Sequence, residues 1–416
     1  MIVNDNIYSN KINKQELSFN AGTLSNSTDD LKRETRTGTT IQKEMSSENY
    51  SNDAEETNVR RLKSLEKACR HLGYTDDNNT IAIRAHMSPN YKFLYCRVNK
   101  CASTTTLEVM RQIFNCDTEC MVKIASLVRS NVNASKIMKN AFSFIVVREP
   151  YGRLFSTYCN IFFFPKEDWI YRGTKIIQLT RSNISSDSLN FGHDLTFSEL
   201  IKYTVESYEN GLHLDEHVRP MHHKSCNPCL FHFDYIAHLE TLKKDFEYIL
   251  KTIHQRNIIQ NYPKDLVSSL REWSLYGPVK HLFRTILLVK GSSISSYNIF
   301  LRAWSYYQII GQISKSIDFP FRKDDVESIT REEFLQTLKV AIESSRREGN
   351  DLNKQRHEAM IQAYSSVSPE YMERLRKVVA TDCFLFSYEE RPDFVFNRSR
   401  FLFNRDNNTF NFFKGL

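Results

Sequence analysis

Residues 93–106 read FLYCRVNKCASTTT, a short apolar run followed by cations and hydroxyl side chains. The length and the β-forming residues of the apolar part, 93–98, predict a buried strand rather than a helix. Apolar residues then recur at helical spacing: Leu107, Met110 and Phe114. A helix is therefore expected to begin near Ser103 or Thr104. The free N–H groups at such a helix N-terminus form a ready site for an anion.

The loop between this strand and helix carries groups that suit a phosphate. The ammonium group of Lys100 is flexible enough to reach a bridging oxygen, and residues 103–105 offer hydroxyls and backbone N–H groups. The glycines of the nucleoside triphosphate loop, G-x-x-x-x-G-K-S/T, are absent, which disfavours a nucleotide kinase. A plain strand, turn and N-capped helix without a ligand is the structural alternative.

A second segment has the same layout. Residues 143–147 form an apolar strand, Arg148 follows at its end, and Pro150 suits the first turn of a second helix with its own anion-binding N-terminus. The guanidinium of Arg148 is a planar fork that matches a terminal phosphate, and Ser156 can place a hydroxyl beside it. An ordinary surface ion pair is the alternative for Arg148. The inward face of this helix consists of Leu154, Phe155 and Tyr158.

Further short segments follow in a fixed order: 215–221 (DEHVRPM), 226–229 (CNPC), 233–236 (FDYI), 239–242 (LETL), and the stretch 371–388 with Tyr371, Asp382 and Phe386-Ser387-Tyr388. The first two segments resemble the phosphate-binding motifs of sulfotransferases that use 3′-phosphoadenosine 5′-phosphosulfate (PAPS). The order of the later ones is similar to the Golgi carbohydrate sulfotransferases of the HNK-1 and chondroitin/dermatan 4-O type. The resemblance covers about residues 85 to 390.

The resemblance implies an α/β protein of the P-loop-like sulfotransferase fold, with a central, mostly parallel sheet flanked by helices. It implies transfer of a sulfonate group from PAPS to a glycan hydroxyl, with PAP as product and no metal. The residues that it assigns to PAPS are Asn99, Lys100, Cys101, Ala102, Ser103, Thr104, Thr105 and Thr106 at the 5′-phosphosulfate, and Arg148 and Ser156 at the 3′-phosphate. The family loop usually reads Pro-Lys-x-Ala-Cys-Thr-Asn-Trp, so this chain departs from it at Asn99 and at residues 105–106.

Sulfuryl transfer is an in-line displacement comparable to phosphoryl transfer. It requires a cation at the bridging oxygen, donors around the sulfonate and a base for the acceptor hydroxyl. Lys100 meets the first requirement and residues 103–106 meet the second. We expect His217 to be the base, because an imidazole titrates near neutral pH, with Glu216 beside it in the catalytic set. Asp215 and Glu216 could instead serve as the base or orient the ring, His222 and His223 are further alternatives, and a purely structural role is the alternative for His217.

Composition and charge fit this assignment. The chain has 416 residues, 41% of them hydrophobic and 25% charged, which is typical of a globular protein. A net charge of +7 suits an enzyme that binds anionic substrates, and the lack of a lysine-rich run or basic helix disfavours nucleic acid as a partner. Two alternatives of another class stay open. One is an inactive homologue that binds PAP or sulfated glycans, and the other is a nucleotide kinase.

The chain divides by composition into three parts. Residues 1–58 are polar and are expected to be disordered, 59–392 form the sulfotransferase domain, and 393–416 form a C-terminal tail. A helix is expected over residues 59–72. The region 251–390 reads as mostly helical and is expected to end in a last strand near residues 384–388. One of its periodic faces consists of Leu335, Leu338, Ala341 and Ile342.

The sequence also bears on the location of the protein and on the chemistry of its cysteines. The sequence has no run of about 18 apolar residues and no N-terminal signal core. The resemblance nevertheless implies a Golgi protein, since family members carry an N-terminal membrane anchor, and sequons that permit glycosylation are present. The nine cysteines argue against complete pairing. A disulfide that involves Cys226 or Cys229 is expected in an oxidising compartment, with a zinc half-site as the alternative.

Overall fold

Among the described residues, the central sheet has five strands in the order β3-β1-β2-β4-β5. The computed structural model describes residues 47–74, 85–116, 122–123, 134–222, 226–262, 276–349, 351–397 and 410–413, and all of them belong to one compact unit, residues 46–416. The strands are β1 (Ala85–Met87), β2 (Phe93–Cys96), β3 (Val122–Lys123), β4 (Phe142–Val147) and β5 (Tyr235–His238).

Strands β2, β4 and β5 run parallel, and β1 pairs antiparallel with β2 and β3. Every residue of β2 and β4 is buried, as their uninterrupted apolar sequences predict for strands covered on both faces. Because the three strands are parallel and adjacent, their carboxyl ends meet at one edge of the sheet. The predicted fold class, an α/β protein with a central sheet flanked by helices, is confirmed.

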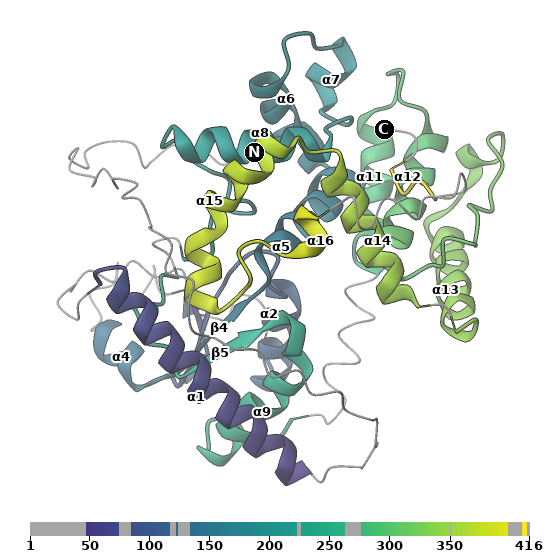
Figure 1. Cartoon of the computed structure of the whole chain (residues 1–416). Helices are drawn as coiled ribbons and strands as arrows, with labels where there is room; N and C mark the ends of the chain where they lie inside the picture. Colours follow the sequence, from purple (N-terminus) through teal and green to yellow (C-terminus); the bar gives the residue numbers. More distant parts are fainter. Residues whose placement is uncertain are drawn as a thin grey trace. The chain divides into compact units, whose positions relative to one another are not determined.

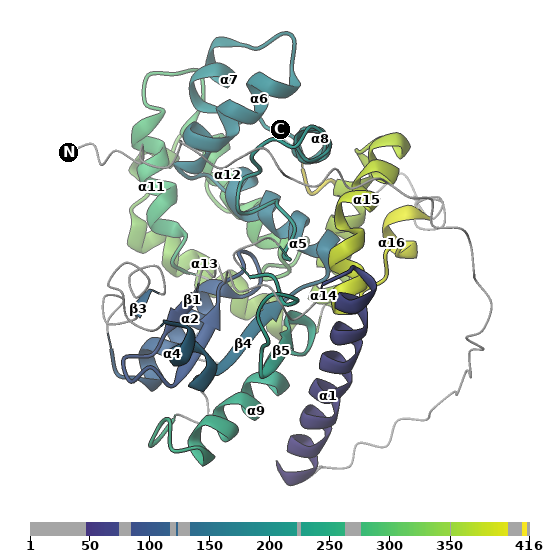
Figure 2. The same ribbon diagram turned by 90° about the vertical axis from the view of Figure 1, so that its left-hand side faces the viewer.

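Two groups of helices surround the sheet. The helices that pack around the sheet core are α1 (Ser47–His71), α2 (Ser103–Ile113), α4 (Ala134–Asn140), η3 (Leu239–Thr241) and α9 (Leu242–Gln255). Helices α1 and α9 lie beside β5, as Figures 1 and 2 show. The predicted helix over residues 59–72 is confirmed, although it begins at Ser47 rather than Val59. The predicted state of residues 1–46 lies outside the described residues.

A second core joins the remaining helices. These are α5 (Pro150–Thr157), the π-helices η1 (Tyr158–Phe163) and η2 (Trp169–Gly173), α6 (Thr174–Thr180), α7 (Ser186–Phe191), α8 (Phe197–Glu209), α11 (Val279–Leu288), α12 (Ser296–Ile309), η4 (Val326–Ser328), α13 (Arg331–Arg347), α14 (Leu352–Ser365), α15 (Pro369–Phe386) and α16 (Asp393–Phe396). The mostly helical character of residues 251–390 is confirmed. The predicted face of α13 is also confirmed, since Leu338, Ala341 and Ile342 are buried and Leu335 is partly buried against the same core.

The predicted last strand near residues 384–388 is wrong. Helix α15 continues to Phe386 and ends at Ser387, which adopts the left-handed conformation with φ 59°. The amide of Tyr388 then donates to the carbonyl of Cys383 at 2.9 Å. A short apolar run does not distinguish a strand from the last turn of a buried helix, and here the preceding helical face continues through it.

None of the helices in the described part of the chain combines the length and the apolar composition needed to cross a bilayer.

Candidate active site

The loop from β2 to α2 makes a tight turn with two left-handed residues. Lys100 and Ala102 both adopt the left-handed conformation, with φ of 66° and 53°. Glycines usually provide such turns, so these two residues take the place of the missing glycines at a cost in backbone strain. No side chain among the described residues caps the N-terminus of α2. The N–H groups of residues 103–105 therefore remain available to an anion, as the sequence predicts.

Some of the predicted residues of this loop lie at the open end of α2, and others point into the protein core. Ser103 is buried, Thr105 is partly exposed and Thr104 is exposed. The hydroxyl of Thr106 instead donates back to the carbonyl of Ala102 at 3.0 Å, and Cys101 is buried with its Sγ 3.7 Å from Met221 Sδ.

Arg148 joins the two predicted anion-binding segments directly. It follows β4, is only 5% exposed, and its Nη1 donates to the carbonyl oxygen of Lys100 at 3.1 Å. Burial lowers the pKa of this guanidinium to about 10, with a further contribution from Arg356. Ser156 lies on α5 and is partly exposed, but no hydrogen bond links it to Arg148 among the described residues.

The N-terminus of α5 is not an open anion site, contrary to the prediction. Glu149 is its N-cap, and its carboxylate accepts hydrogen bonds from the amides of Tyr151 and Gly152. Burial raises the pKa of Glu149 to about 7. Glu240 holds this turn in place, because it accepts from the Glu149 amide at 2.9 Å and from the Tyr388 hydroxyl at 2.8 Å. The second segment therefore offers the Arg148 side chain, rather than helix amides, to a ligand.

The ammonium group of Lys100 is held by a residue that the sequence did not suggest. Its Nζ donates to Asn160 Oδ1 at 2.6 Å, and Asn160 Nδ2 donates to the Tyr306 hydroxyl at 3.2 Å. Asn160 lies in the π-helix η1, and a π-helical turn has no clear sequence signal. Burial, followed by the charges of Lys166 and Arg148, lowers the pKa of Lys100 to about 7.

His217 is oriented by a carboxylate. Its Nδ1 lies 2.7 Å from Asp215 Oδ1, and Arg172 binds the other oxygen of Asp215 while also holding Asp168 at 2.8 Å. Because a carboxylate only accepts hydrogen bonds, Nδ1 carries the proton and Nε2 keeps its lone pair. Burial, and then the charges of Lys100 and Arg172, lower the pKa of His217 to about 3. The imidazole is therefore neutral near pH 7 and lies within the electrostatic reach of Lys100.

Arg153 connects the first loop to the segment that contains His217, and sequence reasoning missed it. It is 3% exposed, and it donates to the carbonyls of Asn99 at 3.0 Å, Arg219 at 2.9 Å and Glu216 at 3.4 Å. Asn99 and Glu216 thus contribute backbone oxygens to this link. Arginine is suited to it because one guanidinium spans several carbonyls.

The other histidines considered as the base are His222 and His223. Nδ1 of His222 lies 2.6 Å from Oδ1 of the buried Asp382, and Asp382 also accepts from the Met221 amide at 2.7 Å. This pair attaches the segment to α15, which is a structural role. His223 lies outside the described residues.

The cysteines near this segment form disulfides: Cys96–Cys226 and Cys69–Cys229. The expected disulfide is confirmed, and the zinc half-site is wrong because both of its sulfurs are bonded to other cysteines. Within the described residues, no group of three or more histidine, cysteine or acidic side chains has a metal-binding arrangement.

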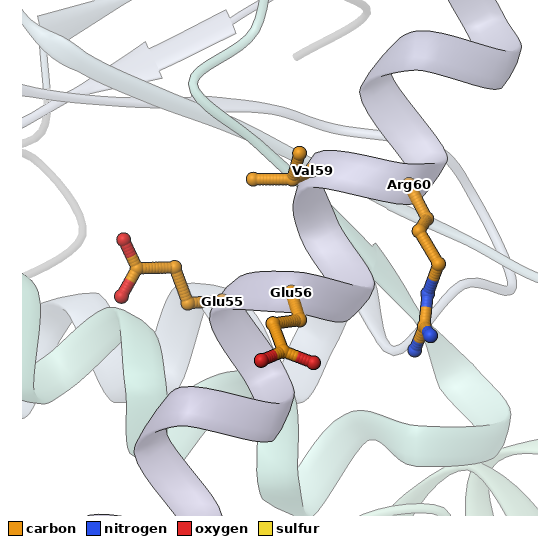
Figure 3. Close-up of a pocket in the computed structure, with 4 residues that line it drawn as sticks. All are labelled: Glu55, Glu56, Val59 and Arg60. Atoms are coloured by element: carbon orange, nitrogen blue, oxygen red, sulfur yellow. The ribbon is translucent and has the colours of Figure 1, made fainter.

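A surface hollow of about 550 Å³ lies on α1, lined by Glu55, Glu56, Val59 and Arg60. Figure 3 shows that the side chains of Glu55 and Arg60 point to opposite sides of the helix, so they do not converge on a ligand. None of the candidate site residues lines it.

Comparison with known proteins agrees with this geometry. Residues 84–276 match the Sulfotransferase family, and this range includes Lys100, Arg148 and His217. Over this range the chain is similar to the sulfotransferase family. Carbohydrate sulfotransferase 14 of Danio rerio is 30% identical over 176 residues, which cover 40% of this chain and 47% of the relative. Its Mus musculus counterpart is 29% identical over 210 residues, 46% of this chain and 54% of the relative.

Carbohydrate sulfotransferase 11 of Rattus norvegicus is 32% identical over 117 residues, 27% of this chain and 33% of the relative. The chain spans about half the length of the first of these relatives. No solved structure matches the chain. The family match ends before α12, α14 and α15, which supply Tyr306, Arg356 and Asp382 to the surroundings of the site.

Proposed function

We propose that this protein is a carbohydrate sulfotransferase that moves the sulfonate group of PAPS to a glycan hydroxyl. One observation supports the proposal most strongly. Lys100 and Arg148 follow adjacent parallel strands and are joined by a hydrogen bond, and the neutral His217 lies within reach of the Lys100 charge. This arrangement combines two anion-binding cations with one base, which is the set that sulfuryl transfer requires.

The loop of residues 99–106 and Arg148 bind the donor in this proposal. The open amide end of α2 binds the 5′-phosphosulfate, and Arg148 binds the 3′-phosphate. Lys100 stabilises the negative charge that develops on the leaving oxygen, because its ammonium group is adjacent to that position in the loop. Asn160 holds the ammonium group ready before the donor arrives.

His217 activates the acceptor in this proposal. Its Nε2 takes the proton of the attacking hydroxyl, while Asp215 keeps the ring oriented and stabilises the imidazolium that forms. A pKa of about 3 makes this imidazole a weak base in the free enzyme. The negative charge of a bound donor offsets Lys100 and raises that pKa, so base strength increases when the donor is in place.

We propose a galactosamine-type residue of a chondroitin or dermatan chain as the acceptor, and a terminal glucuronate of an HNK-1-like glycan as the nearest alternative. The names of the relatives support a carbohydrate acceptor and no finer assignment. The net charge of +7 favours such anionic chains. The catalytic domain is proposed to include residues 59–392, and the described parts of the predicted tail, α16 and residues 410–413, pack against its second core.

We also propose that the enzyme works in the Golgi lumen. The disulfides Cys96–Cys226 and Cys69–Cys229 support this, because such bonds persist in oxidising compartments and are rare in the cytosol.

The test is transfer of label from ³⁵S-labelled PAPS to a panel of desulfated glycans, with γ-³²P-labelled ATP as the control donor. The proposal predicts ³⁵S in a glycan, no ³²P in any product, and transfer by Lys100→Ala that is slower by roughly 10²–10³. Binding of PAP without transfer to any glycan would instead identify an inactive homologue. Transfer of ³²P would identify a kinase.

A further inference from the structure

Arg356 is a solvent-exposed arginine on α14, a helix that contacts α5 next to Arg148, and it lies outside the region that matches the family. It occupies the first turns of α14. Among the described residues it has no hydrogen bond and no ion pair, whereas neighbouring charges on the same helix are paired, such as Glu358 with Lys315 at 2.7 Å. An unpaired guanidinium needs an explanation when it lies near other cations.

The fold places Arg356 firmly. Helix α14 packs against α5 and α12, as Figure 1 shows, and Tyr364 on its inner face donates to the carbonyl of Tyr151 in α5 at 2.8 Å. Gln355, next to Arg356, donates to the carbonyl of Gln308 at the end of α12 at 2.7 Å. Gly311 has φ +67° and is so close that a Cβ there would lie 3.3 Å from Arg356 Cβ. The backbone of Arg356 is therefore anchored, and only its side chain is free to reach a ligand.

Arg356 acts electrostatically on several groups around the proposed donor site. Of the charged groups that act on Arg148, Arg356 is the one that lowers its pKa most after burial, and it also acts on Cys159 and Tyr306, which adjoin Asn160. The acidic groups that face Arg148 are Glu149 and Glu240, and both are engaged by backbone amides. Arg148 and Arg356 therefore lie within electrostatic range of each other, and two guanidinium groups attract an anion more strongly than one.

We propose that Arg356 and Arg148 together bind the 3′-phosphate of the donor nucleotide, so that α14 contributes the second half of that subsite. This inference rests on the proposed function. A phosphomonoester carries close to two negative charges at neutral pH and has three acceptor oxygens, more than one guanidinium fork can satisfy. One N–H group of Arg148 already donates to the carbonyl oxygen of Lys100. Arg148 therefore has fewer N–H groups for the phosphate, and a phosphate oxygen stays available to a second arginine.

The experiment measures, by calorimetric titration of the whole chain, the affinities for PAP and for adenosine 5′-monophosphate, which lacks the 3′-phosphate. Arg356→Ala should weaken PAP binding by roughly 10- to 100-fold, the usual effect of losing a hydrogen bond to a charged group, and should leave binding of the monophosphate unchanged. Arg356→Lys should restore part of the PAP affinity, because it restores charge without the fork.

Lys354→Ala is the matched control, since it removes one exposed cation from the same helix and should change neither affinity. Thermal unfolding checks the fold, and Arg356→Ala should not lower the melting temperature, because Arg356 has no described partner to lose. An unchanged preference for PAP over the monophosphate in Arg356→Ala would overturn the inference and leave the proposed function intact. Failure of the unaltered protein to bind PAP would overturn both.

Discussion

Replacement of Lys100 by alanine should mainly lower kcat. The ammonium group interacts with the leaving oxygen, which gains its charge only as the sulfonate departs, so the lost interaction belongs to the transition state. Removing a single preorganised donor of this kind costs about 2.7–4 kcal/mol, or roughly 10²–10³ in kcat. Because burial lowers the pKa of Lys100 to about 7, the full loss is expected below pH 7, where the ammonium group keeps its proton. PAP should still bind, because Arg148 and the amide end of α2 remain.

The same lysine should determine the pH dependence. Burial lowers its pKa to about 7 in the free protein, so kcat/KM for PAPS should fall by roughly tenfold per pH unit above pH 7 as the ammonium loses its proton. His217 has a pKa of about 3 and stays neutral, so no acid limb is expected near pH 6.5. Lys100→Arg should move the alkaline limb upward by several units, whatever its residual rate, because a guanidinium keeps its proton.

The assay is initial-rate sulfonate transfer at saturating glycan between pH 5 and 9, with separate determination of kcat and KM for PAPS. Normal turnover by Lys100→Ala with only weaker PAPS binding would refute the role at the leaving group. An alkaline limb that stays near pH 7 in Lys100→Arg would show that another residue is titrating.

Three further predictions concern the anion site, the base and the disulfides. Arg148→Ala should raise the KM for PAPS with little change in kcat, because the 3′-phosphate keeps its charge during transfer; a loss confined to kcat would contradict this. His217→Ala should lower kcat by ~10²–10⁴ with PAP binding intact, and a larger loss in Glu216→Gln would transfer the base assignment to Glu216. Cys226→Ser should lower the free energy of unfolding by about 2–5 kcal/mol in denaturant titrations, since Cys96–Cys226 closes a loop with sequence separation 130; equal stability would show that the bond is absent.

The parts of the fold nearest the sheet could be predicted because their sequences are compatible with only one type of secondary structure. The run Phe93–Cys96 is apolar and too short for a helix, and it ends at a loop that changes the periodicity. Pro150 indicates the first turn of α5, and the structure places it there. In both cases a local pattern alone determines the element.

The end of α15 and the cap of α5 could not be predicted because each had two local solutions. Phe384–Phe386 suits a strand as well as a buried helical turn, and tertiary packing selected the helix. The amides at the start of α5 were expected to bind a ligand, but the Glu149 side chain binds them instead. An N-cap residue competes for the same donors as an anion, and the sequence does not show which one wins.

The sequence predicts candidate site residues only where they stand in a recognisable motif. Lys100, Arg148 and His217 stand in recognisable segments, and the structure brings them into mutual electrostatic reach. Asn160 and Arg356 come from elements with no motif, and their relation to Lys100 and Arg148 exists only after the helices pack. Contacts between distant segments depend on the fold, so a local pattern cannot reveal them.

A crystal structure of the protein with PAP tests the central claim most directly, because it locates both phosphates at once. The account predicts the 5′-phosphate at the N–H groups of residues 103–105 with Lys100 beside it, and the 3′-phosphate on Arg148. PAP bound elsewhere, or a PAP-soaked crystal with those N–H groups and Arg148 unliganded at saturating nucleotide, would contradict it.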